Sequence, residues 1–290
     1  MDMKEMAVRR KHILAVLSGA MAVFAIVGAI YIYSGDAGGA GDDVKDGGMT
    51  VAVTPTLDCL PVYVAQETGI ADEMGCILIL QEHASVADCD SALAGGSAVC
   101  VSTDCVRAEM LMERKKADLK KQFVLVRNPN ACLYLFANRK ARIKSASQMK
   151  DKIIAVDRKG ADALMAQYVL DSVKLVDARA FLVNIQSIPI RMSMLANNTI
   201  DAAVLPEPQA TVARKTGHEN LYAEYGRNGN TYGAFLLKKA DMDMFVSIYN
   251  RACDSINKNG IGHYDSILIK RMSVPEKLAK YIPTRRFVKL

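Results

Sequence analysis

The strongest constraint on the fold is an alternation of short apolar runs with segments of helical spacing that begins near residue 49. Four of these runs have the length of strands, at residues 49–54, 76–80, 98–102 and 123–127. Segments of helical spacing separate them, at residues 61–69, 85–94 and 103–114. Because strands that alternate with helices in this way pair in parallel, we expect an α/β unit with a largely parallel sheet. The run at 76–80 (CILIL) is apolar throughout, which predicts a strand covered on both faces.

The pattern starts again after a further strand at residues 133–138. Later strands are expected at residues 152–156, 181–185, 201–205, 221–223 and 232–238. Later helices are expected at residues 145–150, 161–173, 188–197, 209–215, 241–257 and 274–281. The sequence therefore predicts a two-lobed α/β fold with two hinge crossings, in which residues 49–135 and 236–290 form lobe 1 and residues 136–235 form lobe 2. Ligands of open α/β sheets bind beyond the carboxyl ends of the strands, and hinge closure would trap a ligand between the lobes.

An uncharged, mostly apolar run of 21 residues, Ile13–Tyr33, precedes this α/β pattern. It predicts a transmembrane anchor, since a helix of roughly 20 residues spans the bilayer core. Basic residues come directly before the run and aspartates follow it, so residues 1–12 are expected in the cytoplasm and the α/β part across the membrane. Residues 34–48 are rich in glycine and aspartate and predict a flexible linker. A cleaved signal peptide and a buried globular helix are the alternatives to an anchor.

Charge and cysteine content indicate which ligands and partners the chain is expected to bind. Residues 50–290 carry a surplus of seven basic side chains, a mild excess that fits an anionic ligand. The densest basic run, Arg114–Lys121, has no interleaved aromatic residues and reads as a solvated helix face, so no nucleic-acid partner is expected. The seven cysteines include no CxxC pair, which predicts no metal site, and most of them are expected to be small buried residues. Their disulfide pairing stays open.

Four stretches of the sequence resemble one known family. They are LPVYVAQETGIADEMGCILIL, ALAGGSAVCVSTDC, SASQMKDKIIAVDRKG and MSMLANNTIDAAVLPEPQATVA, and they occur in the family's order over residues 50–240. The chain thereby resembles the solute-binding proteins of ABC importers for nitrate, sulfonate, taurine and thiamine-pyrimidine precursors. The resemblance implies the type II periplasmic-binding-protein fold, non-catalytic capture of a small molecule, and an ABC permease with its ATPase as partners.

The loops that follow the predicted strands supply the candidate ligand-binding residues. These are Thr56, Leu57, Asp58, Cys59, Thr103, Asp104, Asn130, Arg158, Gly160, Asp162 and Glu207. Several of them have structural alternatives as helix caps or turn residues. Arg158–Gly160, before a predicted helix, is the best candidate for an anion site. Glu207 would instead favour a cationic or amide-bearing ligand, so the two together predict a zwitterion or a polar heterocycle.

The sequence favours a binding protein over an enzyme, and neither a catalytic residue nor a cofactor is expected. Cys59 with His83 is a conceivable nucleophile pair, and Cys59, Cys105 and Cys132 fall in predicted cleft loops, where a soft metal or a disulfide is conceivable. We expect a solute-binding protein in the inner (cytoplasmic) membrane, with a single span, the N-terminus inside and the binding domain in the periplasm or outside. It would capture a small polar organic ligand for an ABC importer. The alternatives are a fold-related enzyme of pyrimidine or menaquinone-precursor metabolism and a ligand-sensing module.

Overall fold

The computed structural model describes residues 48–114, 121–174, 180–224 and 232–290. The predicted cytoplasmic flank, anchor and nearly all of the linker lie outside these residues. Among the helices that the structure describes, none is long and apolar enough to cross a membrane.

Lobe 1 is built on a five-stranded sheet with the order β2-β1-β3-β10-β4. Its strands are β1 (Gly48–Val53), β2 (Ile77–Glu82), β3 (Cys100–Asp104), β4 (Phe123–Asn128) and β10 (Gly233–Lys238). β1 pairs in parallel with β2 and β3, whereas β10 is antiparallel to both β3 and β4. Its helices are α2 (Leu60–Glu67), α3 (Ile70–Glu73), α4 (Val86–Gly95), α5 (Cys105–Arg114), α10 (Met242–Asn259), α11 (Asp265–Lys270) and α12 (Glu276–Ala279).

Lobe 2 repeats this plan with a second sheet, ordered β7-β6-β8-β5-β9. Its strands are β5 (Leu133–Ala137), β6 (Ile153–Val156), β7 (Phe181–Asn184), β8 (Ala202–Pro206) and β9 (Glu219–Glu224). Its helices are α7 (Ala161–Ser172), α8 (Ile188–Ala196) and α9 (Gln209–Lys215). In each sheet the fourth strand, β10 or β5, directly follows a crossing from the other lobe and runs antiparallel to its neighbours. The prediction of two α/β lobes is therefore confirmed.

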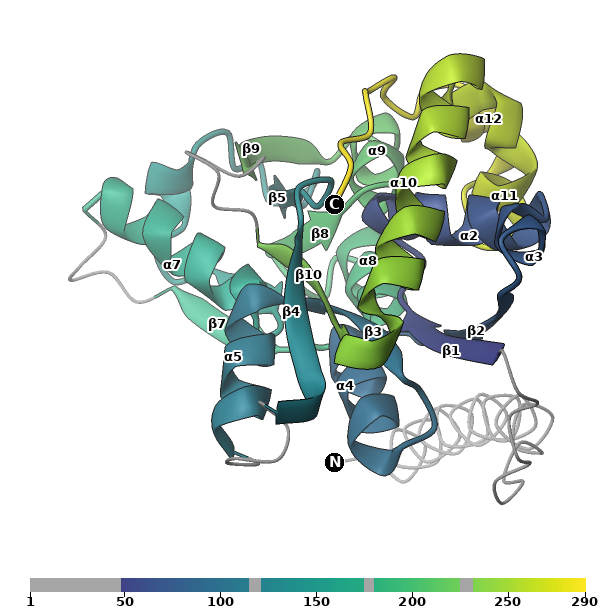
Figure 1. The fold of residues 1–290 in the computed structure, drawn as a ribbon. Helices are drawn as coiled ribbons and strands as arrows, with labels where there is room; N and C mark the ends of the chain where they lie inside the picture. The colour runs from purple at the N-terminus through teal and green to yellow at the C-terminus, as the bar shows by residue number, and fades with distance from the viewer. Residues whose placement is uncertain (1–47, 115–120, 175–179, 225–231) are drawn as a thin grey trace, which may run out of the picture. The chain divides into compact units, whose positions relative to one another are not determined.

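Apolar side chains on alternate sides of the central strands hold helices against both faces of the sheets. In β10, Phe235 and Leu237 pack with α2 and α10, while Leu236 packs on the opposite face with residues of α4. Phe235 meets Phe245 of α10 edge-on, with ring centroids 4.8 Å apart. Figure 1 shows this arrangement, with α4 and α5 on one side of the sheet and α2 and α10 on the other. Burial on both faces explains why the central strands read as continuous apolar runs.

Three sequence-based expectations about individual elements were wrong. The CILIL strand was expected to be covered on both faces, but β2 is an edge strand, and Ile77 and Ile79 are 52% and 43% exposed. The expected helix at 274–281 is only the four-residue α12, and α11 before it was not predicted. The expected helix at 145–150 is a short 3-10 turn, Ala146–Gln148.

The crossings between the lobes lie slightly earlier in the chain than expected. The boundaries expected after residues 135 and 235 fall inside β5 and β10, and the chain changes lobe between β4 and β5 and again between β9 and β10. Asn130, in the first crossing, was a candidate ligand contact, but its side chain is only 1% exposed and bonds to other parts of lobe 1. Its amide nitrogen donates to Tyr249 Oη (3.0 Å) and to the Val288 carbonyl (2.7 Å), and its oxygen accepts from the Val288 amide (2.9 Å). Asn130 thereby ties the crossing to α10 and the C-terminal segment.

Replacing Asn130 by alanine is expected to lower the free energy of unfolding by about 2–4 kcal/mol, since three buried hydrogen bonds are lost and each contributes about 1 kcal/mol. Urea unfolding measures this. Asn197→Ala is the matched control, because Asn197 is exposed and its side chain bonds only to Ser193 within the same helix. Its effect should stay within about 0.5 kcal/mol. Equal stability of the two variants would contradict the role assigned to Asn130.

Candidate functional site

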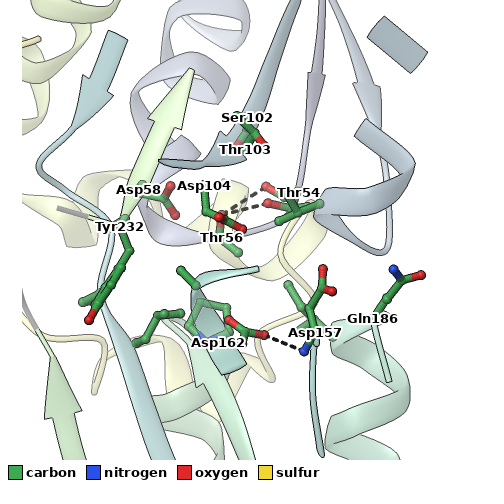
Figure 2. A pocket seen from close by; sticks show the side chains of 18 of the residues that line it. Thr54, Thr56, Asp58, Ser102, Thr103, Asp104, Asp157, Asp162, Gln186 and Tyr232 are labelled. Atoms are coloured by element: carbon green, nitrogen blue, oxygen red, sulfur yellow. Dashed lines mark hydrogen bonds between the residues drawn. The ribbon is translucent and has the colours of Figure 1, made fainter. Parts of the chain in front are cut away.

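A cavity of about 70 Å³ lies between the lobes, at the carboxyl ends of strands from both sheets. Lobe 1 contributes residues that follow β1 and β3, and lobe 2 contributes residues that follow β6, β7 and β8. The polar lining residues are Thr54, Thr56, Asp58, Ser102, Thr103, Asp104, Asp157, Asp162, Gln186, Arg191 and Tyr232. Figure 2 shows Thr54, Thr56 and Asp104 facing Asp157, Asp162 and Gln186 across this space. The position agrees with the ligand site expected for open α/β sheets.

Hydroxyl groups form the lobe 1 side of the cavity. Thr56 follows β1, and its Oγ1 lies 3.2 Å from Thr54 Oγ1. Ser102, near the end of β3, accepts a hydrogen bond from the Cys59 thiol at 3.1 Å. Burial, with Asp58 beside it, raises the pKa of Cys59 to about 12, so this thiol stays protonated and is a poor nucleophile. The conceivable role of Cys59 as a catalytic nucleophile gains no support from this environment.

Carboxylates dominate the charge of the cavity. Four aspartates line it, with Arg191 as the single cation among the described lining residues. Arg191 is 3% exposed and forms an ion pair with Asp162 of α7. Its Nη1 also donates to the Val204 carbonyl, yet its Nε is buried without a hydrogen-bond partner among the described residues. A buried donor without a partner is costly, so the burial of Arg191 is only partly offset by its other contacts.

A second arginine, Arg107 of α5, joins the two lobes. Its Nε lies 2.5 Å from Asp90 in lobe 1, and its Nη1 lies 2.8 Å from Asp157 in lobe 2. Both aspartates are buried, and the Arg107 side chain is only 11% exposed. Asp90 also accepts from Thr103 Oγ1 at 2.9 Å. One guanidinium therefore neutralises carboxylates from both sides of the cleft.

Asp104 makes a further contact between the lobes. Its Oδ1 accepts the backbone N–H of Arg107 at 2.9 Å, which caps the N-terminus of α5 as the sequence predicted. The same carboxyl lies beside the N-terminus of α7 in lobe 2, where the Ala161 amide lowers its pKa. A Cβ at Gly160 would lie 2.7 Å from Asp104 Oδ2, so any larger residue at this position would displace the Asp104 carboxyl. Burial raises the pKa of Asp104 to about 7, and the negative charge of Asp162 adds to the rise although two backbone amides oppose it.

Three hydrogen bonds to backbone groups also cross the cleft. The Leu57 amide donates to the Glu207 carbonyl at 2.7 Å, and the Ile188 amide donates to the Ala84 carbonyl at 3.0 Å. Gln209 Nε2 donates to the Pro55 carbonyl at 2.9 Å. Together with Arg107 and Asp104, these contacts hold the two lobes closed on the cavity.

The structure brings five of the sequence-based candidates together in the cavity lining: Thr56, Asp58, Thr103, Asp104 and Asp162. The other candidates lie outside it. Leu57 and Cys59 are buried, Gly160 lies close to the Asp104 carboxyl, and Asn130 belongs to the crossing.

Two side chains expected to set the ligand's charge do not point into the cavity. Arg158 is exposed and lies outside the lining, since Asp157 is the residue of this loop that turns inward. Glu207 is 2% exposed, and its Oε2 accepts the Thr211 amide at 3.0 Å in the first turn of α9. A helix-capping contact therefore explains its burial. The expectation that Arg158 forms an anion site and that Glu207 faces the cleft was wrong.

The polar lining residues absent from the list of candidates are Thr54, Ser102, Asp157, Gln186, Arg191 and Tyr232, although Ser102 and Asp157 belong to strand-end loops from which candidates were drawn. Asp157 directly follows a predicted strand, as several chosen candidates do. Arg191 is the only charged residue in the α8 sequence IPIRMSMLA, an isolation that could have marked it.

The cysteines give no indication of a metal centre. All seven are buried and unpaired as disulfides. Cys132 lines the cavity, but no group of three or more histidine, cysteine or acidic residues within the described ranges is arranged to hold a metal ion.

Comparison with known proteins gives the class of fold. No family model and no curated protein sequence matches this chain. Among solved structures, the alkanesulfonate-binding protein SsuA from Xanthomonas axonopodis pv. citri, bound to MOPS, is 14% identical, with a TM-score of 0.66 over 82% of this chain and 84% of that one. The nitrate-binding protein NrtA from Synechocystis PCC 6803 is 12% identical, with a TM-score of 0.68 over 80% of this chain and 69% of that one.

A ligand-binding component of an ABC-type import system from Staphylococcus aureus, with zinc bound, is also similar. It is 13% identical, with a TM-score of 0.67 over 84% of this chain and 86% of that one. The fold is thus that of ABC-type solute-binding proteins, including those of the nitrate and sulfonate type. The resemblance found in the sequence is confirmed at the level of the fold.

Replacing Arg107 by glutamine is expected to open the cleft, because Asp90 and Asp157 would be left buried without their shared cation. The loss of a buried charge partner costs about 3–5 kcal/mol of stability. Small-angle X-ray scattering should show a larger radius of gyration, and urea unfolding should show the lower stability. Arg158→Gln is the matched control, since this exposed arginine contacts neither carboxylate. A closed and equally stable Arg107→Gln variant would contradict the bridging role.

Proposed function

We propose that this chain is a membrane-anchored, extracytoplasmic solute-binding protein that captures a small polar organic ligand for an ABC importer. The observation that carries the proposal is the cavity between the lobes, lined by strand ends from both sheets and closed by contacts across the cleft. In a two-lobed protein of this kind, hinge closure around a ligand couples binding to a change in shape that a permease can recognise. The structural neighbours named above are binding proteins, which fits a role without catalysis.

The ligand contacts that we propose are Thr56, Asp58, Thr103, Asp104 and Asp162, which meet in the cavity lining. The cavity volume is several times the roughly 10–15 Å³ that one water molecule requires, so it suits a small molecule. Hydroxyl and carboxylate groups supply directional hydrogen bonds, while Val86 and Ile188 provide apolar contact. This combination of apolar walls with a few polar groups is typical of small-molecule sites.

The anchor remains part of the proposal on the strength of the sequence. The span Ile13–Tyr33 is long enough for a bilayer, and the basic flank before it favours an N-terminus in the cytoplasm. Such an anchor would hold the binding lobes near a membrane-embedded permease, which with its ATPase is the proposed partner. The linker at residues 34–48 would let the domain reorient toward that partner.

Ligand binding is expected to stabilise the purified full-length protein, held in mild detergent, without consumption of the ligand. A ligand at 100 times its dissociation constant stabilises by about 2.7 kcal/mol. A thermal-shift screen of sulfonates, nitrate, pyrimidines and amines, followed by mass spectrometry of the ligand, measures both points.

Thr56→Val removes one cavity hydroxyl and should weaken binding about tenfold, equivalent to about 1.4 kcal/mol. Thr216→Val, at the exposed end of α9, is its control. A screen without a single stabilising ligand would contradict the proposed function.

The proposed anchor leads to a separate prediction about membrane topology. In spheroplasts of a Gram-negative host, added protease should digest residues 49–290 while a tag before residue 12 stays protected. Deletion of residues 13–33 should leave the whole domain protected inside the cell, since the export signal is then missing. Release of the full domain into the periplasmic fraction would instead support a cleaved signal peptide.

A further inference from the structure

The N-terminus of α7 is already occupied by a carboxylate from the opposite lobe. Free backbone N–H groups and the helix dipole make such an end a favourable position for an anion. In this protein the carboxyl of Asp104 lies there: a Cβ on Gly160 would be only 2.7 Å from its Oδ2, and the neighbouring Ala161 amide lowers the pKa of the Asp104 carboxyl. Asp104 extends from the end of β3 in lobe 1, so the contact exists only while the lobes are closed. The chain's own side chain thus takes the position that an oxyanion would use.

The charge balance of the cavity also opposes an anionic ligand. Asp162 is paired with Arg191, and Asp157 shares Arg107 with Asp90. Asp58 and Asp104 line the same cavity and have no arginine or lysine in salt-bridge contact within the described part of the chain. Burial raises the pKa of both carboxyls, that of Asp104 to about 7, so an anion beside them would disfavour their ionised forms whereas a cation would favour them. A cation would meet attraction from the same groups.

A second feature of the cavity lining, Arg191, indicates that the ligand also carries a hydrogen-bond acceptor. Arg191 is 3% exposed, lines the cavity, and has a buried Nε without a hydrogen-bond partner among the described residues. Burying such a donor without an acceptor costs roughly 1–3 kcal/mol. As the one cation among the described lining residues, Arg191 also favours an acceptor atom on the ligand, such as a hydroxyl, carbonyl or carboxylate oxygen. The cavity therefore calls for a cationic group and an acceptor in one small molecule.

We propose that Asp104 sets the charge of the ligand: it fills the anion position at the N-terminus of α7, excludes oxyanions, and selects a small amine that also carries a hydrogen-bond acceptor. This inference rests on the proposed function and adds a ligand class to it. Two of the structural neighbours are named as binding nitrate or alkanesulfonates. The same fold here presents a cavity of the opposite charge preference.

Two variants separate the effect of Asp104 on the ligand from its effect on folding. Asp104→Ser keeps a side chain that can cap α5 but is too short to reach α7, which vacates the anion position. Asp104→Asn keeps the size and removes the charge. Glu109→Gln removes the same charge from an exposed position of α5 and is the matched control. Circular dichroism and the thermal midpoint establish that each variant is folded.

The probes are 2-aminoethanol and 2-hydroxyethanesulfonate, which share a hydroxyethyl group and carry opposite charges, together with nitrate. Isothermal titration calorimetry on the full-length protein in detergent measures their affinities. The wild type and Glu109→Gln should bind 2-aminoethanol and neither anion. Both Asp104 variants should bind 2-aminoethanol at least tenfold more weakly, and Asp104→Ser should bind the sulfonate or nitrate at least tenfold more tightly than the wild type does.

Three results would overturn the inference. They are tight binding of an oxyanion by the wild type, unchanged 2-aminoethanol binding in both Asp104 variants, and failure of every probe to bind any form of the protein. The proposed function is judged separately, by the ligand screen and by mass spectrometry of any small molecule that co-purifies. A neutral or anionic native ligand would leave the binding-protein proposal standing and refute the amine selectivity.

Discussion

The guanidinium of Arg107, held between Asp90 of lobe 1 and Asp157 of lobe 2, is the interaction on which the closed site depends. It offsets two buried carboxylates that would otherwise repel each other across the cleft, and it keeps α5 close to the loop that enters α7. Asp104, whose position α5 also fixes, then reaches the N-terminus of α7. The backbone hydrogen bonds from Leu57 and Ile188 across the cleft accompany the same closed arrangement.

The net charge of the whole chain differs in sign from the charge of the cavity lining. The chain has a formal charge of +6, which fitted an anionic ligand as long as the positions of the charges were unknown. In the folded protein the basic surplus lies elsewhere, and the cavity is lined by four aspartates and one arginine among the described residues. Charge summed over a chain describes the long-range field and solubility, whereas a ligand in a closed cleft responds to groups a few ångströms away. The class of ligand therefore depends on the charged groups in the site and not on the net charge of the chain.

The architecture was predictable because the sequence patterns that indicate strands and helices agree with the burial of these elements in the folded protein. Strands covered on both faces have continuous apolar sequences. Serine N-caps such as Ser85 and Ser187 mark where the helices after these strands begin. The errors occurred where a neighbour decides the outcome. Whether the CILIL strand is central or at the edge of the sheet depends on which strands flank it, and the residues of the strand itself do not indicate its neighbours.

The sequence by itself determined the two α/β halves, the order of their elements and the strand-end loops that supply the cavity, because these follow from periodicity and chain connectivity. It also contained the apolar span and basic flank that support the proposed anchor. Only the tertiary structure decided which loop side chains turn inward, since that depends on contacts between residues far apart in the chain. The N-terminus of α7 illustrates the difference: the sequence marked Arg158–Gly160 as an anion site, and folding brought the carboxyl of Asp104, more than fifty residues earlier in the chain, close to Gly160.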